Sequence, residues 1–148
     1  MGTRAFVLLL IVVIAGCEDP GRVGPPPTTP YAFTSRTAYS LDDEFFVTVV
    51  SPTTEIDMSD CCGTGTLPFY IDILESGHWL PFSFTFCIIS GCPSRIIHLG
   101  PDGNFTYRIV LSETLYGDDP TSGTYRLRIP YFEFGQQKEI VTNPFTLK

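Results

Sequence analysis

Long apolar runs are scarce in this chain of 148 residues, and the longest lies near its start. Residues 5–16 form an uncharged, mostly apolar run of twelve residues, which the acids Glu18 and Asp19 follow closely. A helix that crosses a bilayer needs about 20 apolar residues. We therefore expect this run to act as an address for export and not as a membrane-spanning helix.

Basic residues are scarce as well. Nine Lys and Arg residues stand against sixteen Asp and Glu residues, which gives the chain a net charge of −7. A surface of this sign repels nucleic acid and anionic lipid, because their phosphates carry the same charge. The composition therefore argues against a nucleic-acid partner.

Histidine, a common general base, occurs only as His78 and His98. Nothing in the spacing couples either one to Ser and Asp as a catalytic triad requires, although such partners can meet in space. We interpret both as surface or edge residues. The sequence thus predicts a non-enzymatic protein without cofactor or metal, and a hydrolase with a site built from loops is the alternative.

The start of the chain has the layout of a secretory signal, in which a cation precedes an apolar run and small residues. Arg4 supplies the cation, and Ile14-Ala15-Gly16-Cys17 ends the run. This ending resembles a bacterial lipobox. The resemblance implies that a signal peptide, residues 1–16, is removed and that the Cys17 thiol receives a diacylglyceryl group. An ordinary signal that happens to end near a cysteine is the alternative.

A lipid on Cys17 would hold the protein to a membrane of the cell envelope. Two or three acyl chains such as palmitate bind firmly, since each buried methylene contributes about 0.8 kcal/mol. Glu18 stands where Asp would imply inner-membrane retention, so the resemblance favours the outer membrane. Residues 17–30 are rich in Pro and Gly, which form neither helix nor central strand. We expect this segment to be an extended tether.

Besides Cys17, the chain contains four cysteines: Cys61, Cys62, Cys87 and Cys92. In an oxidising compartment an even set predicts disulfides, here two. A bond between the adjacent Cys61 and Cys62 would strain the peptide, so we expect each to pair with Cys87 or Cys92. Closing such a loop of about 30 residues contributes about 3 kcal/mol in the chain-entropy model. A four-thiolate metal site is disfavoured, because zinc sites use paired cysteines with a spacer.

Strand patterns recur through residues 31–148, which we expect to form one all-β domain of about seven to nine strands. Alternation is clearest in residues 105–112 and 124–129. Residues 44–50 are apolar on nearly both faces, which predicts a strand covered on both sides, and residues 53–66 look like an irregular loop. The expected strands are residues 31–41, 44–50, 67–74, 79–86, 95–99, 105–112, 124–129 and 140–147.

Three segments together resemble bacterial immunoglobulin-like domains found on lipoproteins: Tyr70–Trp79 with its Glu-x-Gly turn, Ser122–Arg128 with Gly-x-Tyr-Arg-Leu, and Val141–Leu147. The resemblance implies an antiparallel β-sandwich in which the Tyr125 hydroxyl, two residues after Gly123, contacts backbone just upstream. The cysteines depart from the inter-sheet pair of antibody domains. The family implies a binding or spacer module, and fold alone fixes no activity.

Two sets of side chains are candidates for binding. Arg108, Arg126 and Arg128 could share a solvated face and meet a carboxylate partner, or could form cross-strand ion pairs with glutamates such as Glu133. Trp79 is interpreted as a core anchor, with an exposed ligand platform as the alternative.

The sequence thus predicts a membrane-anchored lipoprotein of the cell envelope with a non-catalytic β-sandwich that binds or spaces. The lipid on Cys17 would contact the membrane, and a further partner would be an envelope protein or a glycan. An accessory or inhibitor domain that docks on a partner through a loop or sheet edge is the main alternative. A large exposed apolar patch would favour docking.

Overall fold

A computed structural model describes residues 27–60, 67–85, 95–110 and 120–148. The expected signal peptide, Cys17, most of the tether and the four other cysteines lie outside these residues. Every regular element in the described part of the chain is a β-strand, and no helix there could cross a membrane. The predicted all-β class is confirmed.

Eleven strands follow one another along the described residues, more than the seven to nine expected. The difference arises because the expected strands 31–41 and 140–147 each correspond to two strands, and residues 56–60 form a strand that was not expected. The eleven strands are β1 (Tyr31–Thr34), β2 (Ala38–Tyr39), β3 (Glu44–Ser51), β4 (Ile56–Asp60), β5 (Tyr70–Glu75), β6 (His78–Phe84), β7 (Arg95–Leu99), β8 (Gly103–Val110), β9 (Gly123–Glu133), β10 (Gln136–Val141) and β11 (Phe145–Leu147).

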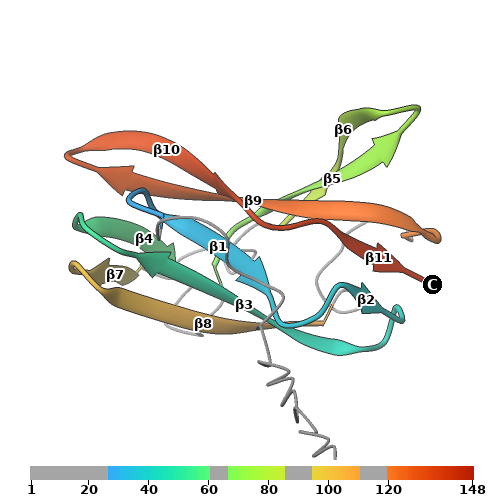
Figure 1. The fold of residues 1–148 in the computed structure, drawn as a ribbon, viewed down its shortest axis with the longest axis horizontal. Coiled ribbons are helices and arrows are strands. Elements are labelled where there is room, and N and C mark those ends of the chain that lie inside the picture. The colour runs from blue at the N-terminus through green and yellow to red at the C-terminus, as the bar shows by residue number, and fades with distance from the viewer. Residues whose placement is uncertain (1–26, 61–66, 86–94, 111–119) are drawn as a thin grey trace, which may run out of the picture.

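The strands form two sheets that pack against each other as a sandwich (Figure 1). The smaller sheet has three strands in the order β1-β3-β8, all antiparallel. The larger sheet has eight strands, with β2-β11-β9-β4-β7 as its main path, β10 beside β9, and β5 between β9 and β6. A two-layer arrangement of this kind lets each sheet bury one apolar face.

Strand β9 organises the larger sheet, because its eleven residues exceed the length of any neighbour. On one side its two halves pair with β10 and β11, and on the other side with β5 and, through the single pair Phe132–Asp57, with β4. Its side chains alternate strictly: Tyr125, Leu127, Ile129 and Tyr131 are buried between the sheets. The residues between them therefore face outward.

Tyr125 lies at the centre of the core. The side chain is fully buried, and its ring packs on Phe82 and Phe145 with centroid separations of 5.6 and 6.2 Å. Its hydroxyl donates a hydrogen bond of 2.8 Å to the carbonyl of Thr121, the upstream contact that the resemblance implies. Gly123 makes room for the ring, since a Cβ atom there would lie 3.3 Å from the Tyr125 Cε2 atom.

The single strand predicted for residues 31–41 is wrong, because the chain changes sheets within it. β1 pairs with β3 in the smaller sheet, whereas β2 pairs with β11 in parallel in the larger one. The crossing is held by the Arg36 amide, which donates to the Tyr39 hydroxyl at 2.5 Å. Composition gives no sign of this switch, since both halves have strand-forming residues.

Two further predictions need correction. β3 is covered on one face only: Phe45, Val47 and Val49 are fully buried, but Phe46 on the other face is 44% exposed. Residues 53–66 are not entirely irregular, because β4 lies within them with Ile56 and Met58 buried. The apolar side chains at every second position of β4 reach the core between the sheets.

The Glu-x-Gly turn between the expected strands 67–74 and 79–86 joins them as a hairpin. Glu75 and His78 pair across a two-residue turn in which Ser76 has φ +48° and Gly77 has φ +82°. Positive φ at both central residues is the type I′ geometry that fits the twist of paired strands.

Candidate functional site

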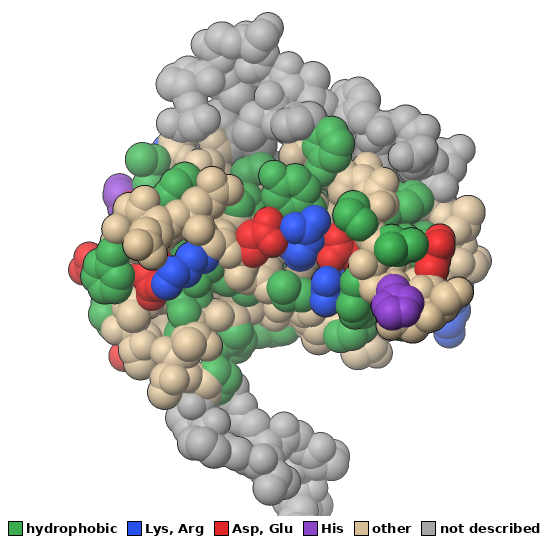
Figure 2. All heavy atoms as spheres, turned by 90° about the horizontal axis from the view of Figure 1, so that it is seen from above, with side chains coloured by type: hydrophobic (Ala, Val, Ile, Leu, Met, Phe, Trp, Pro, Cys, Tyr) green, Lys and Arg blue, Asp and Glu red, His purple; other side chains and the backbone are tan. Residues whose placement is uncertain are grey.

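The outer face of the larger sheet carries the residues of greatest chemical interest. Figure 2 views the molecule from the side of β9 and β10 and shows acidic and basic side chains in contact near the centre, with hydrophobic side chains around them. Because β9 alternates, Arg126, Arg128 and Phe132 all belong to this face. Two candidate sites lie on it, one charged and one apolar.

The charged site is centred on Asp72 of β5, whose side chain is only 4% exposed. The Arg126 Nε atom donates to Oδ2 of Asp72 at 3.0 Å, and the Arg128 Nε atom donates to Oδ1 at 3.0 Å. Arg128 also donates through Nη1 to Glu139 of β10 at 2.9 Å. Burial alone lowers the pKa of Arg128, but its bonds to Glu139 and Asp72 outweigh this and raise the pKa.

Each arginine also lies over an aromatic ring. The guanidinium carbon of Arg126 is 4.5 Å from the centroid of the Trp79 ring, and that of Arg128 is 4.9 Å from the Tyr70 ring. Such cation–π contacts add to the ion pairs. Trp79 is half-buried on this outer face and does not belong to the buried core, so its prediction as a core anchor is wrong.

The predicted arginine set divides between the sheets. Arg108 lies on β8 of the smaller sheet, where its Nε atom donates to Glu44 of β3. The glutamate named as a partner, Glu133, binds Lys138 across the β9–β10 hairpin and not an arginine. The cross-strand ion pairs are thus present with other partners: Asp72 binds Arg126 and Arg128 together.

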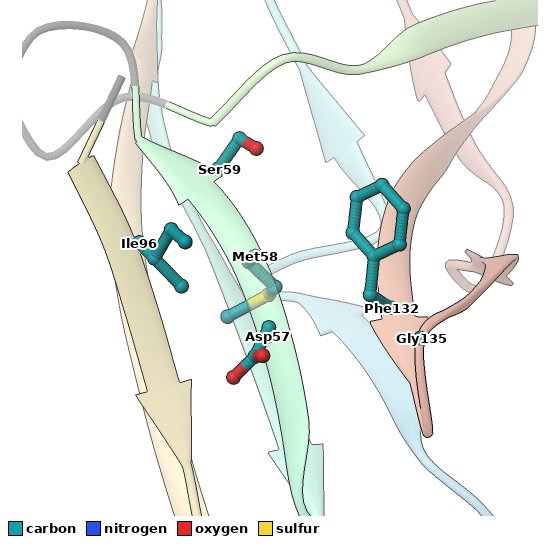
Figure 3. A pocket seen from close by; sticks show the side chains of 6 residues that line it. All are labelled: Asp57, Met58, Ser59, Ile96, Phe132 and Gly135. Atoms are coloured by element: carbon teal, nitrogen blue, oxygen red, sulfur yellow. The ribbon is translucent and has the colours of Figure 1, made fainter. Parts of the chain in front are cut away.

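The apolar site is a shallow groove of about 310 Å³ over β4. Figure 3 shows Ile96 of β7 and Phe132 of β9 on opposite sides of β4, with side chains of β4 between them. The walls are exposed to solvent, because Ile96 is 55% and Phe132 is 40% accessible. The groove is lined by Asp57, Met58, Ser59, Ile96, Phe132 and Gly135.

Strand register explains why these residues meet. β4 lies between β7 and β9, with Ser59 opposite Ile96 and Asp57 opposite Phe132. Residues directly opposite one another point to the same face of a sheet. The groove therefore exists only because β4 is inserted between two strands that are far apart in sequence.

Asp57 also pairs with His98, its other neighbour in register, through Oδ1 and the imidazole Nδ1 at 2.5 Å. Both side chains are largely exposed. Among the described hydrogen bonds none joins Ser59 to His98, and His78 lies on β6, away from the groove residues. Within the described ranges no cluster of three or more His, Cys, Asp or Glu side chains could hold a metal ion.

Phe134 stands beside the groove at the tip of the β9–β10 hairpin. It is 86% exposed, with φ +51°, and Gly135, which lines the groove, follows with φ +75°. A residue other than Gly or Asn is disfavoured in this left-handed region by roughly 1–2 kcal/mol, because its Cβ atom approaches the following carbonyl oxygen. Phe134 is thus both strained and exposed in the isolated domain.

Sequence reasoning missed Ile96, Phe132 and Phe134. One signal was present: Phe134-Gly135 stands at a two-residue hairpin turn, where Asn-Gly or Asp-Gly is the usual choice. A large aromatic residue at that position is a local contradiction in the sequence. The approach of Ile96 to Phe132 depends on non-local pairing and has no local signal.

No known family model matches this chain, and no curated protein is significantly similar to it.

Proposed function

We propose that this chain is a lipid-anchored protein of the cell envelope whose immunoglobulin-like β-sandwich docks on a protein partner through the groove over β4. The anchor is inferred from the apolar run and from Cys17 after Ala15 and Gly16. The immunoglobulin-like assignment is supported by the packing of two sheets as a sandwich and by the hydrogen bond from the Tyr125 hydroxyl to the Thr121 carbonyl.

The observation that carries the docking function is the group of exposed apolar side chains at one end of the larger sheet. Ile96 and Phe132 line one groove and are 55% and 40% exposed, and Phe134, which precedes the lining residue Gly135, is 86% exposed. A pure spacer gains nothing from such exposure, which lowers solubility, and clustered exposed apolar side chains mark interaction sites. Docking is therefore favoured over a spacer role.

A protein partner fits this groove better than a glycan does. Its walls are the hydrocarbon side chains of Ile96 and Phe132, which favour an apolar side chain. The carboxylate of Asp57 is already engaged by His98 at 2.5 Å. That leaves Ser59 as the only other hydroxyl-bearing or charged side chain of the lining to bind sugar hydroxyls.

The same geometry supports a non-catalytic role. The Asp57–His98 pair is open to water, and no nucleophilic side chain in the described residues is hydrogen-bonded to His98. General-base catalysis needs the base within hydrogen-bond reach of the group that it deprotonates. The pair instead links β4 to β7 at the side of the groove.

Site-specific photo-crosslinking in intact cells tests the docking surface. A photoreactive phenylalanine analogue at Phe132 should give protein adducts, because this side chain would be covered in the complex. The same analogue at Phe46, which is similarly exposed on the smaller sheet, serves as the matched control. Adducts from position 46 but not from position 132 would contradict the proposal.

A further inference from the structure

Phe134 occupies a position that the isolated domain does not favour. A type I′ turn requires positive φ at both central residues, and Asn-Gly meets this requirement without strain. The chain has Phe134 there at φ +51°, and the side chain is 86% exposed. Strain that buries no surface in the free protein points to a role in a complex.

A projecting side chain and a hollow lie next to each other at this end of the molecule. Phe134 precedes Gly135, and Gly135 lines the groove between Ile96 and Phe132. The groove measures about 310 Å³, and a cavity of about 150 Å³ suffices for a benzene ring. The groove therefore has more volume than a phenyl group needs.

The exposed Phe134 side chain, here called the knob, lies next to the groove lined by Ile96 and Phe132, here called the hole. A surface that carries both a knob and a hole can be complementary to a copy of itself. In a twofold dimer the same patch of each copy faces the other, so each knob can enter the hole of its partner, and the assembly closes at two copies. Phe134 does not fill the groove of its own chain, because its side chain is 86% exposed. The exposed ring and the groove are therefore complementary between two copies.

Charge at this end of the molecule permits two copies to approach. The chain carries a net charge of −7, but the carboxylate of Glu133, which precedes Phe134, is paired with Lys138. Pairing of charges reduces the repulsion between identical surfaces. An anionic bilayer is a poorer occupant, since its acyl chains offer no ring-bearing side chain to fill a concave site.

We propose that the partner of this groove is a second copy of the chain, with Phe134 of each copy seated between Ile96 and Phe132 of the other. This inference rests on the docking groove of the proposed function, but it does not depend on the lipid anchor. Phe134 is the anchoring side chain of the interface, and Ile96 forms a wall of the site that receives it.

Sedimentation velocity over a concentration series tests the dimer, using the full chain with Cys17→Ser so that no lipid contributes. The Cys17→Ser chain without further substitutions should show a reversible monomer–dimer equilibrium. Phe134→Asn, which removes the exposed ring, and Ile96→Asp, which places a charge in the apolar wall of the groove, should each raise the dissociation constant at least about tenfold. Phe46→Asn on the smaller sheet is the control and should dimerise unchanged.

Mixing the two variants gives the sharpest readout. A Phe134→Asn chain keeps its hole, and an Ile96→Asp chain keeps its knob, so one knob-in-hole contact survives only in the mixed dimer. The mixture should therefore associate more tightly than either variant alone. At a protein concentration well below the dissociation constant of the dimer, Phe134→Asn should also unfold at a higher urea concentration than the parent, because Asn relieves the turn strain. This comparison separates lost binding from lost folding.

Several results would overturn the proposal. These are a monomer at all concentrations up to hundreds of micromolar, assembly beyond the dimer, no rescue on mixing, or solution monomers that bind phosphatidylglycerol vesicles only when Phe134 is present. Monomers in solution together with adducts to another protein from position 132 would remove the second copy and retain the docking groove. An unlipidated Cys17 with an intact dimer would remove only the anchor.

Discussion

At the scale of single residues, Tyr107 and Tyr125 both bury a hydroxyl group but differ in whether that group forms a hydrogen bond. Tyr125 donates to the Thr121 carbonyl at 2.8 Å, whereas the Tyr107 hydroxyl on β8 has no hydrogen-bond partner within the described ranges. Burial raises the pKa of Tyr107 far above its ordinary value, so this phenol stays neutral. An unpaired buried hydroxyl costs free energy that its bonded counterpart does not.

We predict that Tyr107→Phe leaves the free energy of unfolding unchanged or raises it by about 1 kcal/mol, since the substitution removes only an unpaired hydroxyl. Tyr125→Phe is the matched control and should lower the free energy of unfolding by about 1 kcal/mol, because it deletes a made bond. Urea denaturation measures both values. A clear loss of stability in Tyr107→Phe would show that its hydroxyl is paired.

At the scale of elements, Asp72 couples β5 to β9 through Arg126 and Arg128. Its side chain is 4% exposed, while the two arginines are about one quarter exposed. Removing one member of a buried charge network leaves the others uncompensated. The exposed pair of Glu44 and Arg108 joins β3 to β8 in the other sheet and offers a direct comparison.

We therefore predict that Asp72→Asn lowers the free energy of unfolding by about 2–3 kcal/mol, somewhat less than for a fully buried network because solvent screens the arginines. Glu44→Gln should change it by less than about 1 kcal/mol, as expected for an exposed pair. Equilibrium unfolding at low and high salt measures both. Equal losses in the free energy of unfolding for the two variants would contradict the prediction that Asp72 stabilises the fold more than the exposed Glu44 does.

The elements also show what local patterns can and cannot predict. The alternation in β9 was visible in the sequence because Tyr125, Leu127 and Ile129 repeat at every second position, and the structure buries all three. β4 was missed because its five residues carry only two apolar side chains, and their burial depends on the strands beside them. Short strands are specified by their neighbours more than by their own sequence.

The candidate sites likewise combine features that a local pattern predicts with features that depend on pairing between distant strands. Arg126 and Arg128 were recognisable as outward residues, but their common partner Asp72 depends on the register between β5 and β9. Likewise, the groove needs β4 to bring Ile96 and Phe132 into register on one face. Such pairings join residues distant in sequence, and a one-residue slip would send each side chain to the other face.

At the scale of the whole molecule, the proposed anchor and tether would hold the docking domain at a membrane surface. A weak interface gains effective concentration when both partners are confined to one surface, so anchoring would favour the contact between copies that the groove suggests. In the proposed dimer the ring of Phe134 would be buried, which would offset the strain that this residue has in the free domain.

The most direct test of this account is the mass of the N-terminal peptide from the exported protein, measured by mass spectrometry after expression in a bacterium that processes lipoproteins. The account predicts that the peptide begins at Cys17 and carries a diacylglyceryl group with its acyl chains, and that Cys17→Ser abolishes the modification. A peptide that retains Met1, or one that begins at Cys17 with a free thiol, would contradict it.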